Sequence, residues 1–586
     1  MEEIEQLSLG LIDWGMIIMY FLIIFTVAGW ATIKERKGEE DSAGYFLAGR
    51  NVGWFVIGAS LFASNIGSEH LIGLAGTGAS SGVAVGQFEI LASLILLLLG
   101  WVFVPFYVKS GVFTMPEFLE RRYSSGARWY LATISIVAYV LTKISVTIFA
   151  GGVVFTAIGV PFWWGALIVV GVTGAYTILG GLRAVLYTDL VQVFVLIGGS
   201  LAVTFIGINQ LGGWGELQAA AGPGFFDMWK PLSHPDFPWT GIIFGAPILG
   251  VWYWCTDQFI VQRTLSAKNI DHARRGTIFA GWLKLLPLFI FVIPGVVAYA
   301  LQQQGSLTLA DPDQALPVLV GALLPVGLRG IVVAGLLAAL MSSLSSVFNS
   351  CSTLVTLDVY REMKPEATES QLVWVGRLST VVLTILGLAW IPLMDNISSQ
   401  LYTYLQSVQG YISPPIAAVF LLGIMWKRVN AKGAIASLGT GFVLGMMRLG
   451  LELYNGPMRE GLASGGMLEL IAEINFLHFA FFLFLICVAV LVGVSLMTDA
   501  PKPEKVAGLT FATAKEPVAS YAVAGGGAGG GDGGEDIDAA SMPSEMEPTG
   551  IDPPEPEESS ESWRKIDLMW TLGLLVAVAA IWIYFS

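Results

Sequence analysis

Several residues that can ionise lie inside long apolar stretches of the chain. They are Glu89, Lys143, Asp189, Asp257 and Lys284, and His70 lies in a similar setting. An ionisable side chain at the centre of a membrane helix costs about 2.5–3.5 kcal/mol on insertion scales, so such residues face an internal cavity or pair with one another. The alternative for each residue is a structural ion pair or a position at a helix end. This set therefore predicts a polar cavity, or buried ion pairs, inside a membrane protein.

A serine-rich stretch, LLAALMSSLSSVFNS, lies within the apolar run 329–358. Ser342 and Ser343 follow Ala339 by three and four residues, so the three share one helix face. Sodium is a hard cation that prefers oxygen ligands, and two hydroxyls with main-chain carbonyls from an interrupted helix would supply them. Serines in membrane helices also serve close packing, so the pattern alone leaves both interpretations open.

Motifs of enzymes and ATP-driven pumps fail in this sequence. The Gly-Ala-Ser-Ser-Gly sequence at 78–82 matches a nucleophile elbow, but it lies between two apolar runs with no strand before it. No Gly-Lys dipeptide occurs, which excludes a Walker A site, and neither HExxH nor a zinc-type Cys/His cluster is present. Cys255, Cys351 and Cys487 all lie in apolar stretches, where they form no disulfide framework. We therefore expect no enzyme and no catalytic residues.

Composition makes lipid the main solvent of the chain. Of the 586 residues, 55% are hydrophobic and 13% are charged, too few charges to cover the surface of a soluble protein of this length. The first apolar run, 11–32, is too long for a signal-peptide core and lacks a cleavage pattern, so we expect it to span the membrane. The net charge is −14, and −11 of it falls within residues 499–562, so the acidity describes one loop rather than a ligand.

Apolar runs of bilayer length recur along the whole chain. They lie near 11–32, 52–75, 88–107, 127–157, 161–180, 184–210, 241–264, 276–302, 329–358, 372–394, 399–425, 433–454, 476–497 and 567–586. We therefore expect an all-α membrane protein with about 14 transmembrane spans.

Basic residues gather in alternate loops. They follow the odd-numbered runs from the first to the eleventh. The groups are, in order, Lys34/Arg36/Lys37; Lys109/Arg121/Arg122/Arg128; Arg183; Arg263/Lys268/Arg274/Arg275; Arg361/Lys364; and Lys427/Arg428. Cytoplasmic loops carry such an excess of cations, so both termini are predicted outside the cytoplasm. The acidic loop 499–562 is then cytoplasmic, and its Gly-, Pro-, Ser- and Glu-rich composition predicts disorder.

Two of the predicted spans are rich in helix-breaking or polar residues at their centres. The second reads GASLFASNIGSEHLIGLAGTGA, and the seventh has Gly245, Pro247 and Gly250 near its middle. They lie five spans apart, in corresponding places of two five-helix units with opposite orientations, which is the pattern of a transporter with its site at the midplane. Simple Gly/Pro kinks are the alternative.

These observations predict the following organisation. Residues 1–51 form the first span and a basic cytoplasmic loop, 52–210 the first repeat, 211–240 an extracellular loop, 241–425 the inverted second repeat, 426–498 two accessory spans, 499–562 the acidic loop and 563–586 the last span.

Long strings in the chain resemble the sodium/solute symporter family, in its sodium–glucose cotransporter branch. They include YFLAGR, GASLFASNIGSEHLIGLAGTGA, FVPFYVKSGVFTMPEFLERRY, YTILGGLRAVLYTDLVQ, WYWCTDQFIVQRTLSAKN, LKLLPLF, LMSSLSSVFNS and PPIAAVFLLGIMWKRVNAKGA, spread over nearly the full length. The resemblance implies a LeuT-like inverted five-helix repeat with flanking helices. It also implies sodium-coupled import of a sugar or polyol by alternating access, in a multi-pass plasma (cytoplasmic or inner) membrane protein.

The resemblance also implies the residues of each site. The sodium site would be the carbonyls of Ala63, Ile66 and Ala339 with the hydroxyls of Ser342 and Ser343. The sugar site would be Asn65, His70, Glu89, Tyr253, Trp254, Lys284 and Gln406. Tyr253 would be the inner gate, and Leu74, Phe88 and Tyr402 the outer gate. Asp189, Ser345 and Ser346 match the region of a second sodium in two-sodium members.

Three positions depart from the family's usual pattern. Gly250 replaces a polar residue, Gln409 replaces a common Thr, and Glu69 stands where animal members have Gly. The sequence therefore leaves open glucose, galactose or myo-inositol as substrate, one or two sodium ions, the oligomeric state and the role of the acidic loop. A non-accumulating sugar sensor is a second hypothesis. A symporter of amino acids, carboxylates or anions is disfavoured, because Lys284 is the only strong cation of the implied pocket and a carboxylate would more naturally be bound by arginine.

Overall fold

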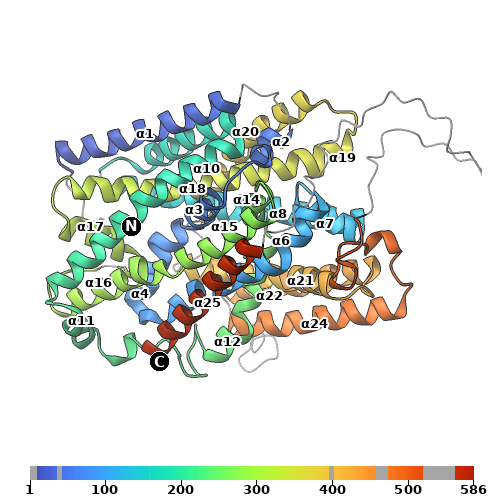
Figure 1. Ribbon diagram of the computed structural model, residues 1–586. Helices are drawn as coiled ribbons and strands as arrows, with labels where there is room; N and C mark the ends of the chain where they lie inside the picture. The colour runs from blue at the N-terminus through green and yellow to red at the C-terminus, as the bar shows by residue number, and fades with distance from the viewer. Residues whose placement is uncertain are drawn as a thin grey trace, which may run out of the picture.

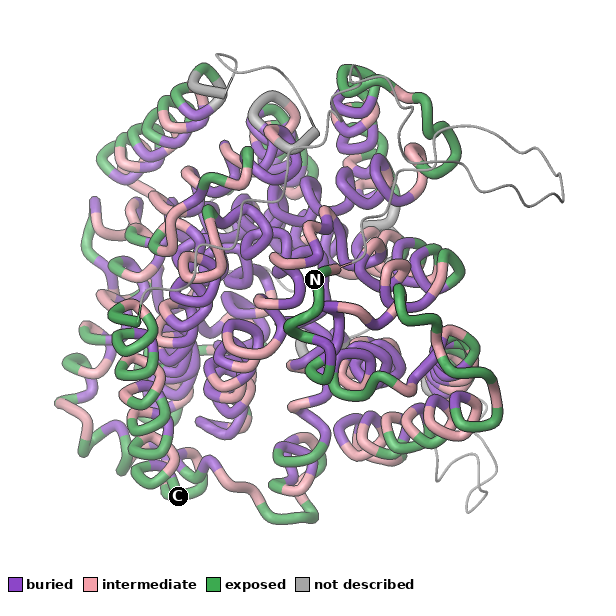
Figure 2. The backbone as a smooth tube through the Cα atoms, turned by 45° about the vertical axis from the view of Figure 1, so that its right-hand side comes forward, coloured by how far each residue is buried: buried purple, intermediate pink, exposed green. Residues whose placement is uncertain are grey.

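A computed structural model describes residues 9–35, 42–157, 159–309, 311–394, 401–455, 473–518 and 561–586. Within these ranges the chain is almost entirely helical, with two isolated β-bridges and no strand. Figure 1 shows long helices lying side by side along one common direction, and Figure 2 shows their backbones buried in the interior and exposed around the outside.

The α-helices up to the middle of the chain are α1 (Leu11–Glu35), α2 (Ser42–Leu47), α3 (Trp54–Asn65), α4 (Ala75–Ser81), α5 (Gln87–Leu98), α6 (Val104–Ser110), α7 (Met115–Arg122), α8 (Ser125–Ala138), α9 (Ser145–Ala157), α10 (Phe162–Gln210), α11 (Trp214–Ala221), α12 (Trp239–Phe244), α13 (Ala246–Gly250) and α14 (Gln258–Leu265). The later ones are α15 (Ile270–Leu283), α16 (Ile293–Gln303), α17 (Ala315–Leu323), α18 (Leu328–Thr353), α19 (Arg361–Met363), α20 (Glu369–Met394), α21 (Leu401–Met425), α22 (Ala431–Asn455), α24 (Phe476–Met497) and α25 (Glu561–Tyr584). Six π-helical segments join some of them: η2 (Glu69–Leu74), η4 (Leu99–Phe103), η5 (Tyr139–Ile144), η7 (Val251–Thr256), η8 (Leu288–Val292) and η10 (Leu354–Tyr360).

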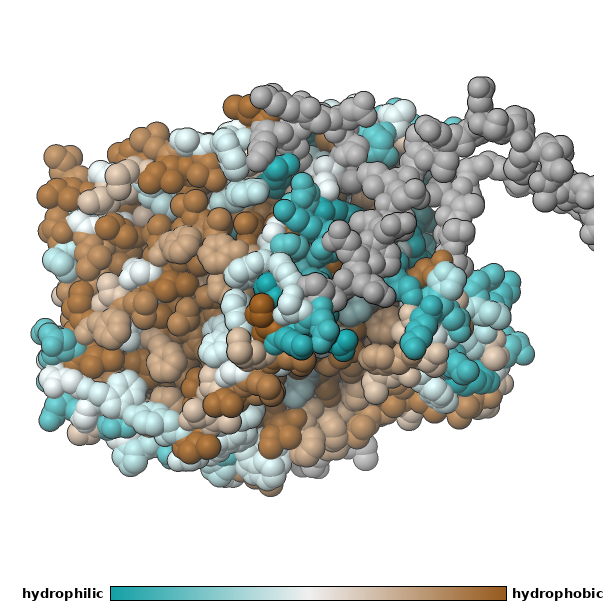
Figure 3. Space-filling view, in the orientation of Figure 1, coloured by the Kyte–Doolittle hydropathy of each residue, from teal (hydrophilic) through white to brown (hydrophobic). Residues whose placement is uncertain are grey.

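Eleven helical segments in the described ranges are long and apolar enough to cross a membrane. The other three predicted spans are the two interrupted ones and 161–180, which is part of the long helix α10. Within α10, Gly181 has φ 51°, a conformation that favours glycine, and it separates the two segments predicted as 161–180 and 184–210. Figure 3 shows apolar side chains covering most of one face, with hydrophilic ones gathered toward its ends. The chain is thus a multi-pass membrane protein, and the total of 14 spans stays a prediction.

The second predicted span is broken where the sequence indicated. Helix α3 ends at Asn65, Ile66 is extended (φ −76°, ψ 104°), and a π-helical segment resumes at Glu69. At the break the main-chain carbonyls of Ser64 and Ile66 accept hydrogen bonds from the Ser343 side chain. Non-helical backbone within a membrane is tolerated only where it is buried in protein or lines a cavity.

The break in the seventh span lies elsewhere than predicted. Gly245 is a turn residue between α12 and α13, but its backbone angles are helical (φ −90°, ψ −51°), and Pro247 and Gly250 lie inside α13. The extended residue is Asp257 (φ −77°, ψ 126°), between η7 and α14. The Asp257 carboxylate accepts a hydrogen bond from the backbone N–H of Phe259 and so caps α14. An aspartate at this position stabilises the start of a new helix, because its carboxylate accepts a hydrogen bond from a backbone N–H of the first turn.

The first residues of α1 and the last residues of α25 lie toward the same end of the molecule (Figure 1). The start of α1 is fixed there by Asp13, whose carboxylate accepts hydrogen bonds from the backbone N–H groups of Gly10, Gly327 and Gly330. Helix α25 is held by Asp567, which pairs with Arg274 and Arg275.

The start of the acidic loop differs from the prediction of disorder. Residues 503–505 and 511–513 form 3₁₀ turns, and the carbonyls of Ala514 and Glu516 accept hydrogen bonds from Lys109. Apolar residues at 506 and 509 are buried there, so this part has enough apolar surface to pack. Residues 519–560 lie outside the described ranges.

Candidate functional site

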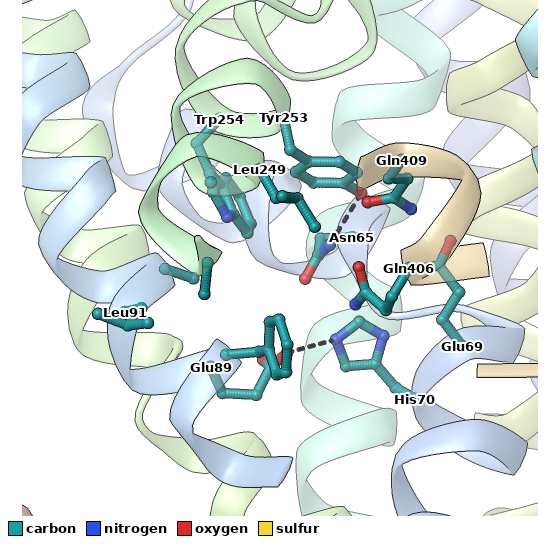
Figure 4. A pocket seen from close by; sticks show the side chains of 14 residues that line it. Asn65, Glu69, His70, Glu89, Leu91, Leu249, Tyr253, Trp254, Gln406 and Gln409 are labelled. Carbon is teal, nitrogen blue, oxygen red and sulfur yellow. Dashed lines mark hydrogen bonds and ion pairs between the residues drawn. The ribbon is translucent and has the colours of Figure 1, made fainter. Parts of the chain in front are cut away.

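A cavity lies between the two interrupted segments and α21. It has about 550 Å³ of space, counted with its opening. Its lining residues are Asn65, Glu69, His70, Phe88, Glu89, Leu91, Ala92, Ala246, Leu249, Gly250, Tyr253, Trp254, Gln406 and Gln409. Figure 4 shows polar and aromatic side chains from four separate segments facing one space. Six of the seven residues predicted for the sugar site are therefore brought together here.

The seventh, Lys284, lies behind the cavity wall. Its ammonium contacts the Glu89 carboxylate, donates to the Asn65 amide oxygen and lies 3.3 Å from Nε2 of His70. Glu89 in turn lies 3.1 Å from the same nitrogen of His70. Each of these four side chains is buried, and the carboxylate and ammonium compensate each other, as buried charges require. This network positions Asn65, His70 and Glu89 at the wall.

Two aromatic residues close one side of the cavity. The Tyr253 hydroxyl accepts a 2.8 Å hydrogen bond from the Asn65 amide, and the Trp254 ring lies edge-on to Tyr253 with centroids 5.1 Å apart. Phe88 lines the cavity, whereas Leu74 is buried and lies outside the lining set. The side chain of Tyr402 is outside the described part of the chain.

The three positions that depart from the family's pattern all line the cavity. Glu69, Gly250 and Gln409 are part of its wall, with Glu69 and Gln409 only partly buried. These three positions could be singled out from the sequence only by comparison with the family's motifs. The lining residues Leu91, Ala92, Ala246 and Leu249 carried no signal, because apolar residues in an apolar run look alike wherever they face.

Two of the five predicted sodium residues, Ile66 and Ser343, contact each other at the break after α3. The Ser343 hydroxyl lies 2.9 Å from the carbonyl oxygen of Ser64 and 3.0 Å from that of Ile66. Ala63 and Ala339 are buried on the same two helices. Three oxygens from a hydroxyl and two main-chain carbonyls are the donor type that a hard cation takes. Ser342 points elsewhere, donating to Asp189 at 2.6 Å.

Asp189 is the centre of a separate buried cluster. Its carboxylate accepts hydrogen bonds from Ser60, Ser64 and Ser342, and Arg263 lies 4.0 Å away. Of the two further serines predicted near it, Ser346 contacts Ser64 and Arg263, whereas Ser345 donates to the carbonyl of Ser342. Ser60, Ser64 and Arg263 were not foreseen, because their contact with Asp189 joins segments more than 70 residues apart in the chain.

The two remaining ionisable residues pair with each other. Lys143 and Asp257 are 2.9 Å apart and buried. Neither residue lines the cavity, so the two form the buried ion pair that was the alternative to a position at the cavity.

A comparison with family models matches residues 45–441 to the sodium:solute symporter family. Sodium/glucose cotransporter 4 of Mus musculus is 41% identical over 546 residues, covering 86% of this chain and 78% of the mouse protein. The sodium/myo-inositol cotransporter of Canis lupus familiaris is 39% identical over 543 residues, covering 85% and 75%.

The fold has a counterpart among solved structures. A Na⁺-coupled sialic acid symporter in its substrate-bound outward-open state superposes with a TM-score of 0.73 over 84% of this chain and 99% of that chain, at 21% sequence identity. At this identity the likeness shows the fold, and the expected all-α, LeuT-like architecture is confirmed. With the family match over most of the chain, the expected function class is confirmed as well: this chain belongs to the sodium:solute symporter family and is a sodium-coupled membrane symporter, not an enzyme.

Proposed function

We propose that the chain imports a sugar or a polyol together with sodium, by alternating access. The observation that carries the proposal is the cavity wall, which combines imidazole, carboxylate and amide groups with the rings of Tyr253 and Trp254. The relatives named as sodium/glucose and sodium/myo-inositol cotransporters support the same substrate class.

The chemistry of the wall suits a ring of hydroxyls. Each hydroxyl both donates and accepts, and the amides of Asn65 and Gln406 offer both functions, while Glu89 accepts. An aromatic face such as that of Tyr253 or Trp254 would cover the apolar side of a sugar ring. The Glu89 charge is compensated by Lys284, so a neutral solute meets no unpaired charge at this point.

Sodium would be held by the Ser343 hydroxyl and the carbonyls at the α3 break, with Ser342 turning from Asp189 to complete the site. Ala63 and Ala339 would add carbonyl oxygens, as the family resemblance implies. Because the same break carries Asn65 and is followed by His70, an ion here would hold both sugar-site residues in place. This shared element is how sodium entry and substrate binding would be coupled.

The direction of transport follows from orientation. We place both termini outside the cytoplasm and the basic loops inside, in a plasma (or bacterial inner) membrane, with repeats at 52–210 and 241–425. The position of the start of α1 and the end of α25 at one end of the molecule supports an even number of crossings. Tyr253 would then close the cavity toward the cytoplasm, and Phe88, with Leu74 and Tyr402, toward the outside.

A second sodium at Asp189, Ser345 and Ser346 is a further part of the proposal. The carboxylate among three serine hydroxyls supports it, although Arg263 already supplies a positive charge nearby. Reversal potentials measured against the sodium gradient give the number of ions per sugar. A slope for one ion per sugar would remove this part of the proposal alone.

A thermal-shift screen tests the substrate class. Purified protein is heated with glucose, galactose, myo-inositol or an amino acid, in sodium and then in potassium. A ligand at 100 times its Kd stabilises the folded state by about 2.7 kcal/mol, so in a chain of this length a binding sugar or polyol should raise the melting temperature by about 2 °C. The shift is expected in sodium only. A shift with amino acids and none with any sugar or polyol would contradict the proposal.

A further inference from the structure

The Lys143–Asp257 pair lies directly against the aromatic residue that closes the cavity. The Lys143 ammonium is 2.9 Å from the Asp257 carboxylate. It also lies 4.4 Å from the ring centre of Tyr253 and 4.1 Å from that of Phe259, both distances typical of cation–π contacts. Lys143 belongs to the π-helical segment η5, a kind of irregularity that is frequent at functional sites.

Tyr253 is therefore held from two directions. On the cavity side its hydroxyl accepts a hydrogen bond from Asn65, a wall residue. Its ring faces Lys143, which is outside the lining set. Any movement of Tyr253 that opens the cavity toward Lys143 must separate the ring from the ammonium.

Asp257 connects this contact to the interrupted helix. It is the extended residue between η7, which carries Tyr253, and α14, which it caps. Lys143 lies on a different span, between α8 and α9. The ion pair thus ties the break of one span to the middle of another, at the place where the two must separate if the cavity opens on this side.

We propose that Lys143, with Asp257, is a positioning residue that keeps the Tyr253 gate shut until the sites are filled. The proposal rests on the assignment of Tyr253 as the gate toward the side of the basic loops. The pair acts through Tyr253 and Asp257 and touches no substrate.

The energetics of buried pairs give the proposal a distinctive signature. Removing one partner leaves the other charge buried and uncompensated, which strongly disfavours the closed arrangement. Opening would let water reach the remaining Asp257 carboxylate. Replacing both partners by neutral residues of similar size is often nearly neutral. Lys143→Met should therefore open the gate, and Lys143→Met/Asp257→Asn should close it again, since Asn can still cap α14.

The native thiol of Cys351 provides the readout. It is buried on α18 and lies within electrostatic range of both Lys143 and Asp257. In a Cys255→Ala/Cys487→Ala background that retains sodium-driven uptake, a membrane-impermeant maleimide is added to full-length protein in inside-out or right-side-out vesicles. Lys143→Met should raise the labelling rate from the basic-loop side at least about tenfold, the double variant should stay within about threefold of the background, and Lys143→Arg should lie between them.

Kinetics separate gating from a merely structural effect. Lys143→Met should lower the maximal uptake rate while half-saturating substrate changes less than about threefold, because the cavity wall is untouched. The matched control is Lys364→Met, which removes an exposed lysine and should change neither labelling nor uptake. If Lys143→Met is too unstable to purify, Lys143→Arg and the double variant carry the same comparison.

Two results would overturn the proposed role of the Lys143–Asp257 pair. In one, Cys351 of Lys143→Met is labelled at the background rate; in the other, Cys351 of the double variant is labelled as fast as in Lys143→Met. Failure of the proposed substrate would be distinct from both. In that case no sugar or polyol would shift the melting temperature of the background protein, while the labelling differences would still be read.

Discussion

At the scale of single residues, the site is a set of side chains that satisfy one another before any solute arrives. Lys284 joins Glu89, Asn65 and His70, and Asn65 continues to Tyr253. The residue types could be predicted from the sequence, because ionisable groups stand out in an apolar run. Their pairing could not, since Glu89 and Lys284 are 195 positions apart and either could have faced another charge.

Replacing Gln406 by Glu tests the sugar site with little risk to the fold. Gln406 lines the cavity and is only partly buried. The change removes an amide donor and adds a negative charge near Glu69 and Glu89. Uptake efficiency should fall about tenfold or more, as expected when a hydrogen bond is lost and a like charge added. The measurement is sodium-dependent uptake of labelled sugar in proteoliposomes.

Gln304→Glu is the matched control, because it makes the same chemical change on an exposed loop residue. Both variants should melt within a few degrees of the parent. Undiminished uptake by Gln406→Glu would remove Gln406 from the sugar site.

Replacing Ser343 by Ala tests the sodium site. The change removes the hydroxyl that lies between the carbonyls of Ser64 and Ile66. The half-saturating sodium concentration should rise about tenfold, consistent with losing one contact to a charged partner. Uptake measured against sodium at fixed sugar gives this value.

Ser350→Ala on the same helix is the control. Among the described residues, the Ser350 hydroxyl donates to the carbonyl of Ser346, one turn earlier, and to no other group. Its sodium dependence should match that of the parent. An equal change in both variants would mean that α18 packing, and not ion binding, is being measured.

At the scale of elements, the sequence predicted two interrupted spans five spans apart, and both are interrupted. The first break lies where small and polar residues gather, at Ile66–Ser68. The second was misplaced, because Gly250 and Pro247 were read as helix breakers although proline is tolerated in the first turn of α13. The actual break at Asp257 depends on a cap and on Lys143 from another span, which a local pattern cannot reveal.

The first break brings Gly67 against the proposed ion site. A Cβ added at Gly67 would lie 2.6 Å from the Ser343 hydroxyl oxygen, closer than van der Waals contact allows. Gly67→Ala should therefore displace that hydroxyl and raise the half-saturating sodium concentration at least about fivefold, since one ligand would be shifted. Gly171→Ala, at an open and exposed helical position, is the control and should leave transport unchanged. Normal sodium activation in Gly67→Ala would contradict this geometry.

The segment between α16 and α18 should make stability depend on pH. Burial, and then the neighbouring charge of Asp311, raises the pKa of Asp313 from 3.8 to about 7. The folded state thus holds the Asp313 proton more tightly than the unfolded state does. Stability from this group is therefore lost as pH rises from about 4 to about 7.

Melting temperatures at pH 5 and pH 8 test this directly. Between pH 5 and pH 8 the melting temperature of the parent should fall by more than that of Asp313→Asn, because the asparagine side chain at position 313 cannot ionise. Equal losses in the two proteins would show that Asp313 does not titrate in this range.

At the scale of the whole molecule, apolar runs of bilayer length were enough to predict an all-α membrane protein, and the spacing of two interrupted spans predicted a transporter with inverted repeats. The LeuT-like fold and sodium-coupled symport were implied only by the family resemblance. Hydropathy could not show that the two apolar runs 161–180 and 184–210 are joined directly at Gly181 within α10, because they appear in the sequence as separate runs. Hydropathy also did not indicate that the carbonyls of Ala514 and Glu516 contact Lys109, since the Gly- and Pro-rich composition of the whole loop outweighs a few buried apolar side chains.

Concentrative uptake into proteoliposomes tests whether the chain couples sugar or polyol import to sodium entry. Purified protein is given an outward-to-inward sodium gradient and a labelled sugar or polyol that shifts its melting temperature. We expect the solute to accumulate above its external concentration, and this accumulation to collapse when sodium is equal on both sides or is replaced by potassium. Binding or current without accumulation would contradict this expectation and would identify a sensor or a conductance instead.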